Sequence, residues 1–140
     1  MGESAAESSW VRRIEEVLRK LGERIRVEAA IVFGSWARGG GGEWSDVDLL
    51  VVSSDVANLS ILDRFSISAE YAREGVDLFI YTPEELESMV RRGSALALSA
   101  LVEGVPVVTC DHVERLRREA SSKYRRLGRV WVSLDASPTP

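Results

Sequence analysis

Two aspartates separated by one residue, Asp46 and Asp48, open an apolar stretch that is typical of a β-strand. Because side chains alternate faces along a strand, both carboxylates project to the same side. Like charges this close repel each other unless a cation lies between them, and carboxylate oxygens suit hard divalent ions such as Mg²⁺ or Mn²⁺. An Asp-x-Asp pattern alone is more typical of a turn or a helix cap, so a metal site needs support from other residues.

A third acid, Asp77, begins the apolar run Val76-Asp77-Leu78-Phe79-Ile80. A carboxylate among buried residues is costly unless it is paired or binds a metal. If this strand lies beside the strand at 47–52, Asp77 can converge on Asp46 and Asp48. The alternative is an exposed carboxylate at the edge of a strand.

Gly34 and Ser35 follow another apolar, partly β-branched run. A glycine lets backbone N–H groups approach an anion closely, a serine hydroxyl adds a donor, and a helix N-terminus favours negative charge. Arg38 could reach the same anion, or it could be a surface arginine. Phosphate-binding groups on one side and three acids on the other predict a metal–nucleotide site.

Four consecutive glycines, Gly39 to Gly42, lie between these two sets of residues. Ordering four glycines loses much backbone entropy, so we expect this part of the connection to be mobile without nucleotide and to take no part in the chemistry. The flanking Trp36 and Trp44 could stack on a base or pack against the sheet.

The elements that must position these residues follow from hydrophobic periodicity and from turn signals. Thr82, Pro83 and Glu85 together predict a helix start with a capping box. A short connection after residue 34 favours antiparallel pairing of the first two strands, which predicts a small mixed β-sheet flanked by helices in an α+β fold. The predicted elements are a helix over 9–23, strands over 27–33 and 47–52, a helix over 58–73, a strand over 76–81, helices ending near Gly93 and Gly104, a strand over 105–109, and a last helix capped by Asp111 that runs to about Leu127.

A chain of 140 residues is most simply one domain. We expect a flexible N-terminus over 1–8, the domain over 9–128 and a C-terminal tail over 129–140. The single cysteine, Cys110, excludes an internal disulfide. No secretory signal is recognisable and no apolar run approaches the length of a membrane span, so a cytoplasmic protein without a membrane partner is expected.

A formal net charge of −4 argues against general nucleic-acid binding. The basic residues are unevenly distributed, because residues 115–129 contain seven basic side chains and one acidic side chain. This segment is either a solvated helix face or a docking surface for an acidic partner.

The chemistry-bearing residues together carry a resemblance to a known family. Gly34-Ser35, ten intervening residues, Asp46-x-Asp48 and the later Asp77 resemble the nucleotidyltransferase superfamily related to DNA polymerase β. The sequences GSWARG and SDVDLLV are most similar to its minimal (MNT-type) nucleotidyltransferases. The resemblance implies the nucleotidyltransferase, polymerase β-like palm fold.

By resemblance, Gly34 and Ser35 would hold the β- and γ-phosphates of ATP, and Asp46 and Asp48 would bind two divalent ions, Mg²⁺ or Mn²⁺. Asp77 would complete the site where the acceptor hydroxyl is activated, as a metal ligand, a general base or both. That hydroxyl would attack the α-phosphorus and pyrophosphate would leave. Two divalent ions suit this displacement, since one activates the attacking oxygen and the other stabilises the leaving group.

Family members of this type resemble antitoxins that transfer AMP to a tyrosine of a HEPN-domain ribonuclease toxin. The resemblance therefore implies a HEPN partner and an antitoxin role. The chain lacks the second domain with which larger nucleotidyltransferases bind an acceptor, which favours a protein acceptor or a site completed by a partner or a second copy. The alternatives are a non-catalytic module that neutralises its partner by contact, and a nucleotidyltransferase for an aminoglycoside-like small molecule.

Overall fold

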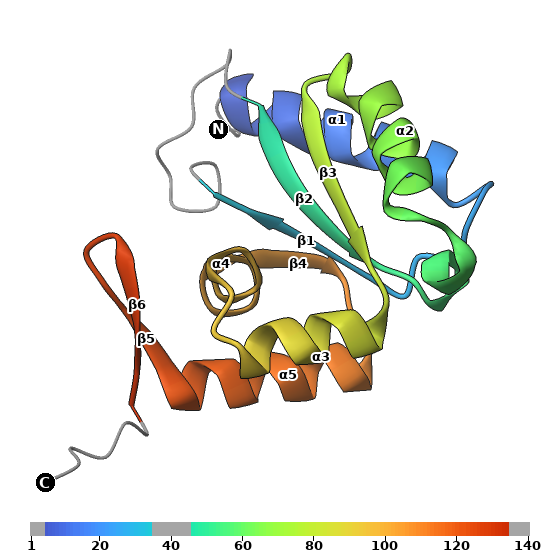
Figure 1. The fold of residues 1–140 in the computed structure, drawn as a ribbon. Coiled ribbons are helices and arrows are strands. Elements are labelled where there is room, and N and C mark those ends of the chain that lie inside the picture. Colours follow the sequence, from blue (N-terminus) through green and yellow to red (C-terminus); the bar gives the residue numbers. More distant parts are fainter. Residues whose placement is uncertain (1–4, 35–45, 135–140) are drawn as a thin grey trace, which may run out of the picture.

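The computed structural model describes residues 5–34 and 46–134, which form a sheet with helices on both faces (Figure 1). The short element η1 is a 3-10 helix. The order of elements is α1 (Ala5–Leu21), β1 (Ala29–Phe33), β2 (Val47–Val52), η1 (Ser54–Asn58), α2 (Ile61–Ala72), β3 (Val76–Tyr81), α3 (Pro83–Arg91), α4 (Ala95–Glu103), β4 (Val105–Val108), α5 (Asp111–Lys123), β5 (Tyr124–Leu127) and β6 (Val130–Ser133).

Four of the strands form one mixed sheet in the order β3-β2-β1-β4. β1 is antiparallel to both of its neighbours, β2 and β4, whereas β2 and β3 are parallel. The predicted antiparallel pairing of the first two strands and the predicted mixed sheet are confirmed. A parallel pair needs a crossover connection, which η1 and α2 supply. As a result, β2 and β3 begin at the same end of the sheet.

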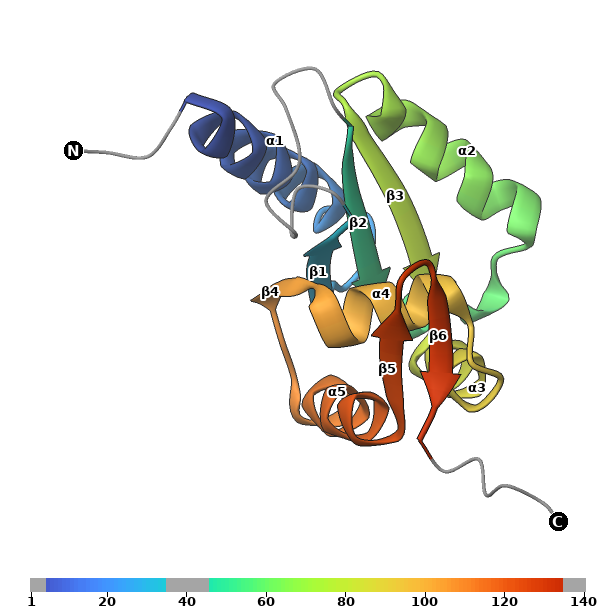
Figure 2. The ribbon, with the colours of Figure 1, turned by 90° about the vertical axis from the view of Figure 1, so that its left-hand side faces the viewer.

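The two faces of the sheet are covered by different helices, as the two views in Figures 1 and 2 show. Leu49 and Val51 are buried on the face covered by α1 and α2, and Leu50 and Val52 on the face covered by α3, α4 and α5. A strand buried on both faces accounts for the near-continuous apolar run in β2. Because side chains alternate along a strand, Asp48 lies on the same face as Leu50 and Val52.

The start of α3 has the predicted cap. The Thr82 hydroxyl accepts a hydrogen bond from the Glu85 N–H at 3.1 Å, and the Glu85 carboxylate accepts one from the Thr82 N–H at 2.8 Å. Pro83 occupies the first helical position. These two bonds satisfy backbone donors that a helix start leaves without partners.

The predicted cap of the last helix is wrong by one residue. Cys110 occupies the N-cap of α5 and makes no side-chain capping bond, and Asp111 is the first helical residue. At that position the carboxylate still lies near the positive end of the helix dipole. Asp111 therefore favours the helix through its charge rather than through a cap.

The predicted end of the last helix is also wrong. α5 ends at Lys123, and β5 and β6 then form an antiparallel hairpin whose turn contains Gly128 at φ 66°. The Tyr124 hydroxyl donates to the Val90 carbonyl on α3 at 2.9 Å. This contact to another helix fixes the chain as it leaves α5, and such tertiary contacts override local helix propensity.

Other boundaries also differ from the prediction. α1 covers Ala5–Leu21 instead of 9–23, β1 begins at Ala29 instead of residue 27, and the helix predicted over 58–73 begins at Ile61, after the separate helix η1. The later start follows from a second capping box, in which Ser60 accepts from the Asp63 N–H at 3.1 Å and Asp63 accepts from the Ser60 N–H at 3.4 Å. The domain limits at 9 and 128 stay a prediction. No helix in the described part of the chain is long and apolar enough to cross a membrane.

Candidate active site

β2 and β3 each carry an aspartate at the second position, and the two residues are direct neighbours. The parallel register pairs Val47 with Val76 and Asp48 with Asp77, and the Val47 N–H donates to the Gly75 carbonyl at 2.9 Å. Neighbouring residues in register lie on the same face of a sheet. The sequence prediction that Asp77 lies beside the Asp-x-Asp strand is therefore confirmed in the backbone register.

Asp46 lies directly before β2 and is exposed. Burial raises the pKa of the Asp77 carboxyl, and the negative charge of Asp46 raises that pKa further. The shift shows that the two carboxylates interact electrostatically. All three predicted acids thus gather at the end of the sheet where β2 and β3 begin.

Gly34 follows the last residue of β1, Phe33, which pairs with Asp48 in the antiparallel register. Gly34 has φ +80°, which L side chains rarely adopt. A Cβ atom at this position would overlap the Asp48 Oδ2 atom and lie 3.2 Å from Asp48 Cγ. Glycine is therefore required here for two reasons, its backbone conformation and the close approach of the Asp48 carboxylate.

Several predicted residues lie outside the described ranges. These are Ser35 and Arg38, the glycines at 39–42, and the tryptophans Trp36 and Trp44. Their predicted roles stay predictions. Of the proposed phosphate-binding set, Gly34 is the member that the structure places against the carboxylates.

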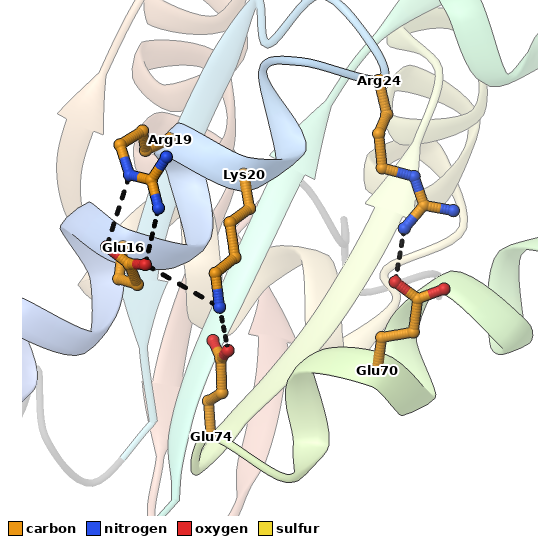
Figure 3. A network of polar contacts seen from close by, with 6 residues as sticks. All are labelled: Glu16, Arg19, Lys20, Arg24, Glu70 and Glu74. Carbon is orange, nitrogen blue, oxygen red and sulfur yellow. Dashed lines mark hydrogen bonds and ion pairs between the residues drawn. The ribbon is translucent and has the colours of Figure 1, made fainter.

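Charged side chains on α1 and in the turn after it pair with α2 and with the turn that leads into β3 (Figure 3). Lys20 forms an ion pair with Glu74, which lies in that turn, and Arg24 pairs with Glu70 near the end of α2 at 2.5 Å. Exposed pairs of this kind contribute little free energy each, on the order of 0–1 kcal/mol. Their effect here is geometric, because they fix the segment from which Asp77 enters the sheet.

At the far end of β3, a buried arginine that sequence reasoning missed lies between α2 and α3. The Arg64 guanidinium donates to Glu85 Oε1 at 2.7 Å and to the Val56 carbonyl at 2.8 Å, and its side chain is 8% exposed. Burial would raise the pKa of the Glu85 carboxyl, but hydrogen bonds from Arg64 and Thr82 outweigh burial and lower it. Arg64 lies three and seven residues before Ile67 and Tyr71, the other buried positions of α2, and this spacing is the signal that could have identified it.

The donor chemistry at the start of β2 and β3 suits a divalent ion. Asp46, Asp48 and Asp77 offer carboxylate oxygens, which Mg²⁺ and Mn²⁺ prefer, and a cation would offset the repulsion that raises the Asp77 pKa. Within residues 5–34 and 46–134, no group of three or more His, Cys, Asp or Glu side chains is gathered tightly enough to hold a metal by itself. The residues therefore fit such an ion by chemistry and placement, while a closed ligand cage is not preformed.

A comparison with protein families gives the class to which this arrangement belongs. The model of the nucleotidyltransferase domain family matches residues 11–128. The chain therefore belongs to that family and is a nucleotidyltransferase, as the resemblance of Gly34-Ser35, Asp46-x-Asp48 and Asp77 predicted. A search of curated proteins found no match.

Solved structures share the fold. A protein from Sulfolobus solfataricus that is provisionally assigned as a nucleotidyltransferase is 22% identical over 75% of this chain and 87% of its own, with a TM-score of 0.52. A toxin–antitoxin structure solved with AMP-PNP contains a chain that is 20% identical over 79% of this chain and 83% of its own length, with a TM-score of 0.54. A structure of a tri-AMPylated Shewanella oneidensis HEPN toxin in complex with MNT antitoxin contains a chain that is 17% identical in sequence. The match covers 81% of this chain and 84% of that chain, with a TM-score of 0.50. The predicted nucleotidyltransferase fold is confirmed.

Proposed function

We propose that this protein transfers AMP from ATP to a hydroxyl of a partner protein, and that the acceptor is a tyrosine of a HEPN-domain toxin that the transfer silences. The observation that carries the proposal is the register that pairs Asp48 with Asp77, with Gly34 against Asp48. Membership of the nucleotidyltransferase domain family supports the class of reaction. The likeness in fold to toxin–antitoxin structures, one with AMP-PNP and one with an AMPylated HEPN toxin, supports the choice of nucleotide and partner.

The reaction is a displacement at the α-phosphorus of ATP. The acceptor oxygen forms a bond to that phosphorus, the bond to the β-phosphate bridging oxygen breaks, and pyrophosphate leaves with the electron pair. The hydroxyl proton passes to Asp77.

The remaining residues bind and orient ATP in this proposal. Asp46, Asp48 and Asp77 would hold Mg²⁺ or Mn²⁺, which, when bound, supplies positive charge to the triphosphate and to the transition state. Gly34 and Ser35 would hold the β- and γ-phosphates, and Arg38 would offset their charge. We place the reaction in the cytoplasm, where ATP is available.

The test is the intact mass of the HEPN-domain protein encoded by the adjacent gene, after incubation with this protein, ATP and Mg²⁺. We expect the partner to gain whole AMP units, and the gain to disappear with Asp48→Asn and with Asp77→Asn. Asp111→Asn is a matched control, since Asp111 is an exposed aspartate on α5, outside the carboxylate end of the sheet, and should leave transfer unchanged.

Two outcomes would replace the proposal. Neutralisation of the toxin that survives both substitutions, without a change in mass, would identify a non-catalytic binding antitoxin. Transfer of AMP to an aminoglycoside-like alcohol, with none to the HEPN-domain protein, would identify a small-molecule nucleotidyltransferase.

A further inference from the structure

A cavity of about 340 Å³ lies between α2 and β3, and we call it the α2–β3 groove. One face of α2 lines it with Ile61, Phe65 and Ala69, and residues 77–81 of β3 line the opposite side. Figure 2 shows α2 running beside β3, which is the edge strand of the four-stranded sheet. The groove therefore follows the open edge of the sheet.

The groove is bordered by large apolar side chains that the protein leaves exposed. Of the lining residues, Ile61 is 58% exposed and Phe65 65%, and Leu62, which follows Ile61 in the first turn of α2 but is not part of the lining, is 75% exposed. The same helix is already anchored by Ile67 and Tyr71, which are buried against the sheet. A second apolar face on a helix that is anchored by its first face is typical of an interaction surface.

Asp77, at the start of β3, is part of the lining of the groove. Its carboxylate, like that of Asp48, belongs to the sheet face opposite α2. In the proposed reaction, Asp77 takes the proton of the acceptor hydroxyl. Because β3 is the edge strand, a segment that lies along the groove can present a hydroxyl to Asp77 around that edge. The edge of β3 is partly occupied along the way, since the Ser68 hydroxyl donates to the Leu78 carbonyl at 2.8 Å.

The charges of the lining select against polar occupants. Among the described residues of the lining, Asp77 and Arg64 are the charged ones, and Arg64 is engaged by Glu85 and the Val56 carbonyl. A triphosphate would find one repelling carboxylate and no available cation in this lining. An aminoglycoside-like alcohol would find few partners for its hydroxyls. Apolar and aromatic side chains with a single hydroxyl, as in tyrosine, match the lining.

We propose that the α2–β3 groove binds the segment of the acceptor protein that carries the modified tyrosine, with apolar side chains of that segment packed on Ile61 and Phe65. The inference rests on the proposed function and adds the place and the chemistry of acceptor recognition. It explains how a chain of this size selects a protein acceptor with its own surface.

The test compares two pairs of exposed apolar residues. Ile61→Ala with Phe65→Ala removes the border of the groove, and Leu127→Ala with Val130→Ala removes residues of similar exposure, 62% each, from the β5–β6 hairpin. Both double variants should fold, since these side chains are largely exposed. Three quantities are measured: the Kd for the adjacent-gene HEPN-domain protein without ATP, the KM values for that protein and for ATP, and the mass in solution by light scattering.

The groove variant should raise the Kd and the acceptor KM by about tenfold or more, with an unchanged KM for ATP, and the hairpin variant should change neither. An unchanged Kd and acceptor KM in the groove variant would overturn the inference while leaving AMP transfer intact. A raised KM for ATP alone would make the groove a nucleotide site, and loss of a homodimer would make it a contact between two copies; either overturns the inference. Failure of the wild type to transfer AMP would overturn the proposed function. The Kd is measured without ATP, so it still shows whether the groove binds the HEPN-domain protein.

Discussion

Charged residues lie at the end of the sheet where β2 and β3 begin and also beyond the end of β3, and the charged groups have different neighbours in the two regions. Where the strands begin, Asp48 and Asp77 are neighbours in register, and burial together with the charge of Asp46 raises the pKa of Asp77. Beyond the end of β3, Glu85 is paired with the buried Arg64. Among the described residues, one end brings carboxylates together, and the other end pairs a carboxylate with a cation.

This difference separates residues that serve chemistry from residues that serve stability. Like charges kept together raise the free energy of the folded state unless a ligand offsets them, so such a cluster indicates a binding site. The charge of the buried Arg64 is instead paired within the fold, with the Glu85 carboxylate and the Val56 carbonyl. Substitutions at the two ends should therefore affect activity and stability in opposite ways.

The largest effect is expected for Asp77→Asn. Removing the proton acceptor should lower the rate of AMP transfer by about 10²–10⁴-fold. The melting temperature should stay equal or rise, because the neutral amide is free of both costs that raise the Asp77 pKa, the burial of a charge and the negative charge of Asp46. Transfer assays and thermal unfolding of the same sample measure the rate and the melting temperature. A large fall in melting temperature would show that Asp77 contributes to stability, which would contradict the prediction.

The next effect is expected for Gly34→Ala. A methyl group would be strained at φ +80° and would displace the Asp48 carboxylate, which should cost roughly 1–2 kcal/mol of backbone strain and about a hundredfold in transfer rate. Gly128→Ala is the matched control, since Gly128 has φ +66° and a Cβ there would meet no atom within 4 Å. Urea unfolding should show strain in both variants, and the transfer rate should fall only at Gly34. Equal rates in both variants would show that the contact with Asp48 is unimportant.

A smaller effect, on stability alone, is expected for Arg64→Met. The change leaves the Val56 carbonyl and Glu85 without their donor and should lower the free energy of unfolding by about 1–3 kcal/mol. Arg91→Met is the control, because Arg91 is 64% exposed in its pair with Glu87 and should matter by less than about 1 kcal/mol. The transfer rate per folded molecule should be the same in both. A rate loss at Arg64 would contradict the division between the two ends.

The smallest effect is a pH dependence at Glu85. Its pKa is lower in the folded protein than the ordinary 4.5, so the stabilisation is present above that value and is lost as pH falls through the lowered folded pKa. The difference in unfolding free energy between wild type and Glu85→Gln should therefore shrink below pH 4.5. Urea unfolding at a series of pH values measures it, and a difference that grows on acidification would contradict this assignment.

The sequence predicted the two strands that carry Asp48 and Asp77 well, for a physical reason. Each aspartate stands inside a short, strongly apolar run, and the bounds of both strands, 47–52 and 76–81, match the structure. Short apolar runs leave few alternatives to a strand, whereas the pairing of the two strands was a condition of the prediction and comes from the tertiary fold. Gly34 was predicted as a phosphate-binding residue, and its contact with Asp48 depends on strand pairing that the spacing does not contain.

The remaining features depend on contacts between segments distant in the sequence. The pair of Arg64 and Glu85 joins two helices, and the α2–β3 groove forms where α2 lies against an edge strand. β5 was predicted as the end of a helix, because the sequence Tyr-Arg-Arg-Leu suits either structure, and β6 as part of a C-terminal tail. The contact of Tyr124 with Val90 belongs to the tertiary fold. Local pattern contains no information on such contacts.

The central claim is that the paired carboxylates of β2 and β3 catalyse AMP transfer to a protein. Pyrophosphate release, measured with ATP and Mg²⁺ in the presence and absence of the HEPN-domain protein, tests it most directly. The account predicts one pyrophosphate for each AMP found on the acceptor with the wild type, and neither product with Asp77→Asn. Neutralisation of the toxin by the wild type without any pyrophosphate release would contradict it.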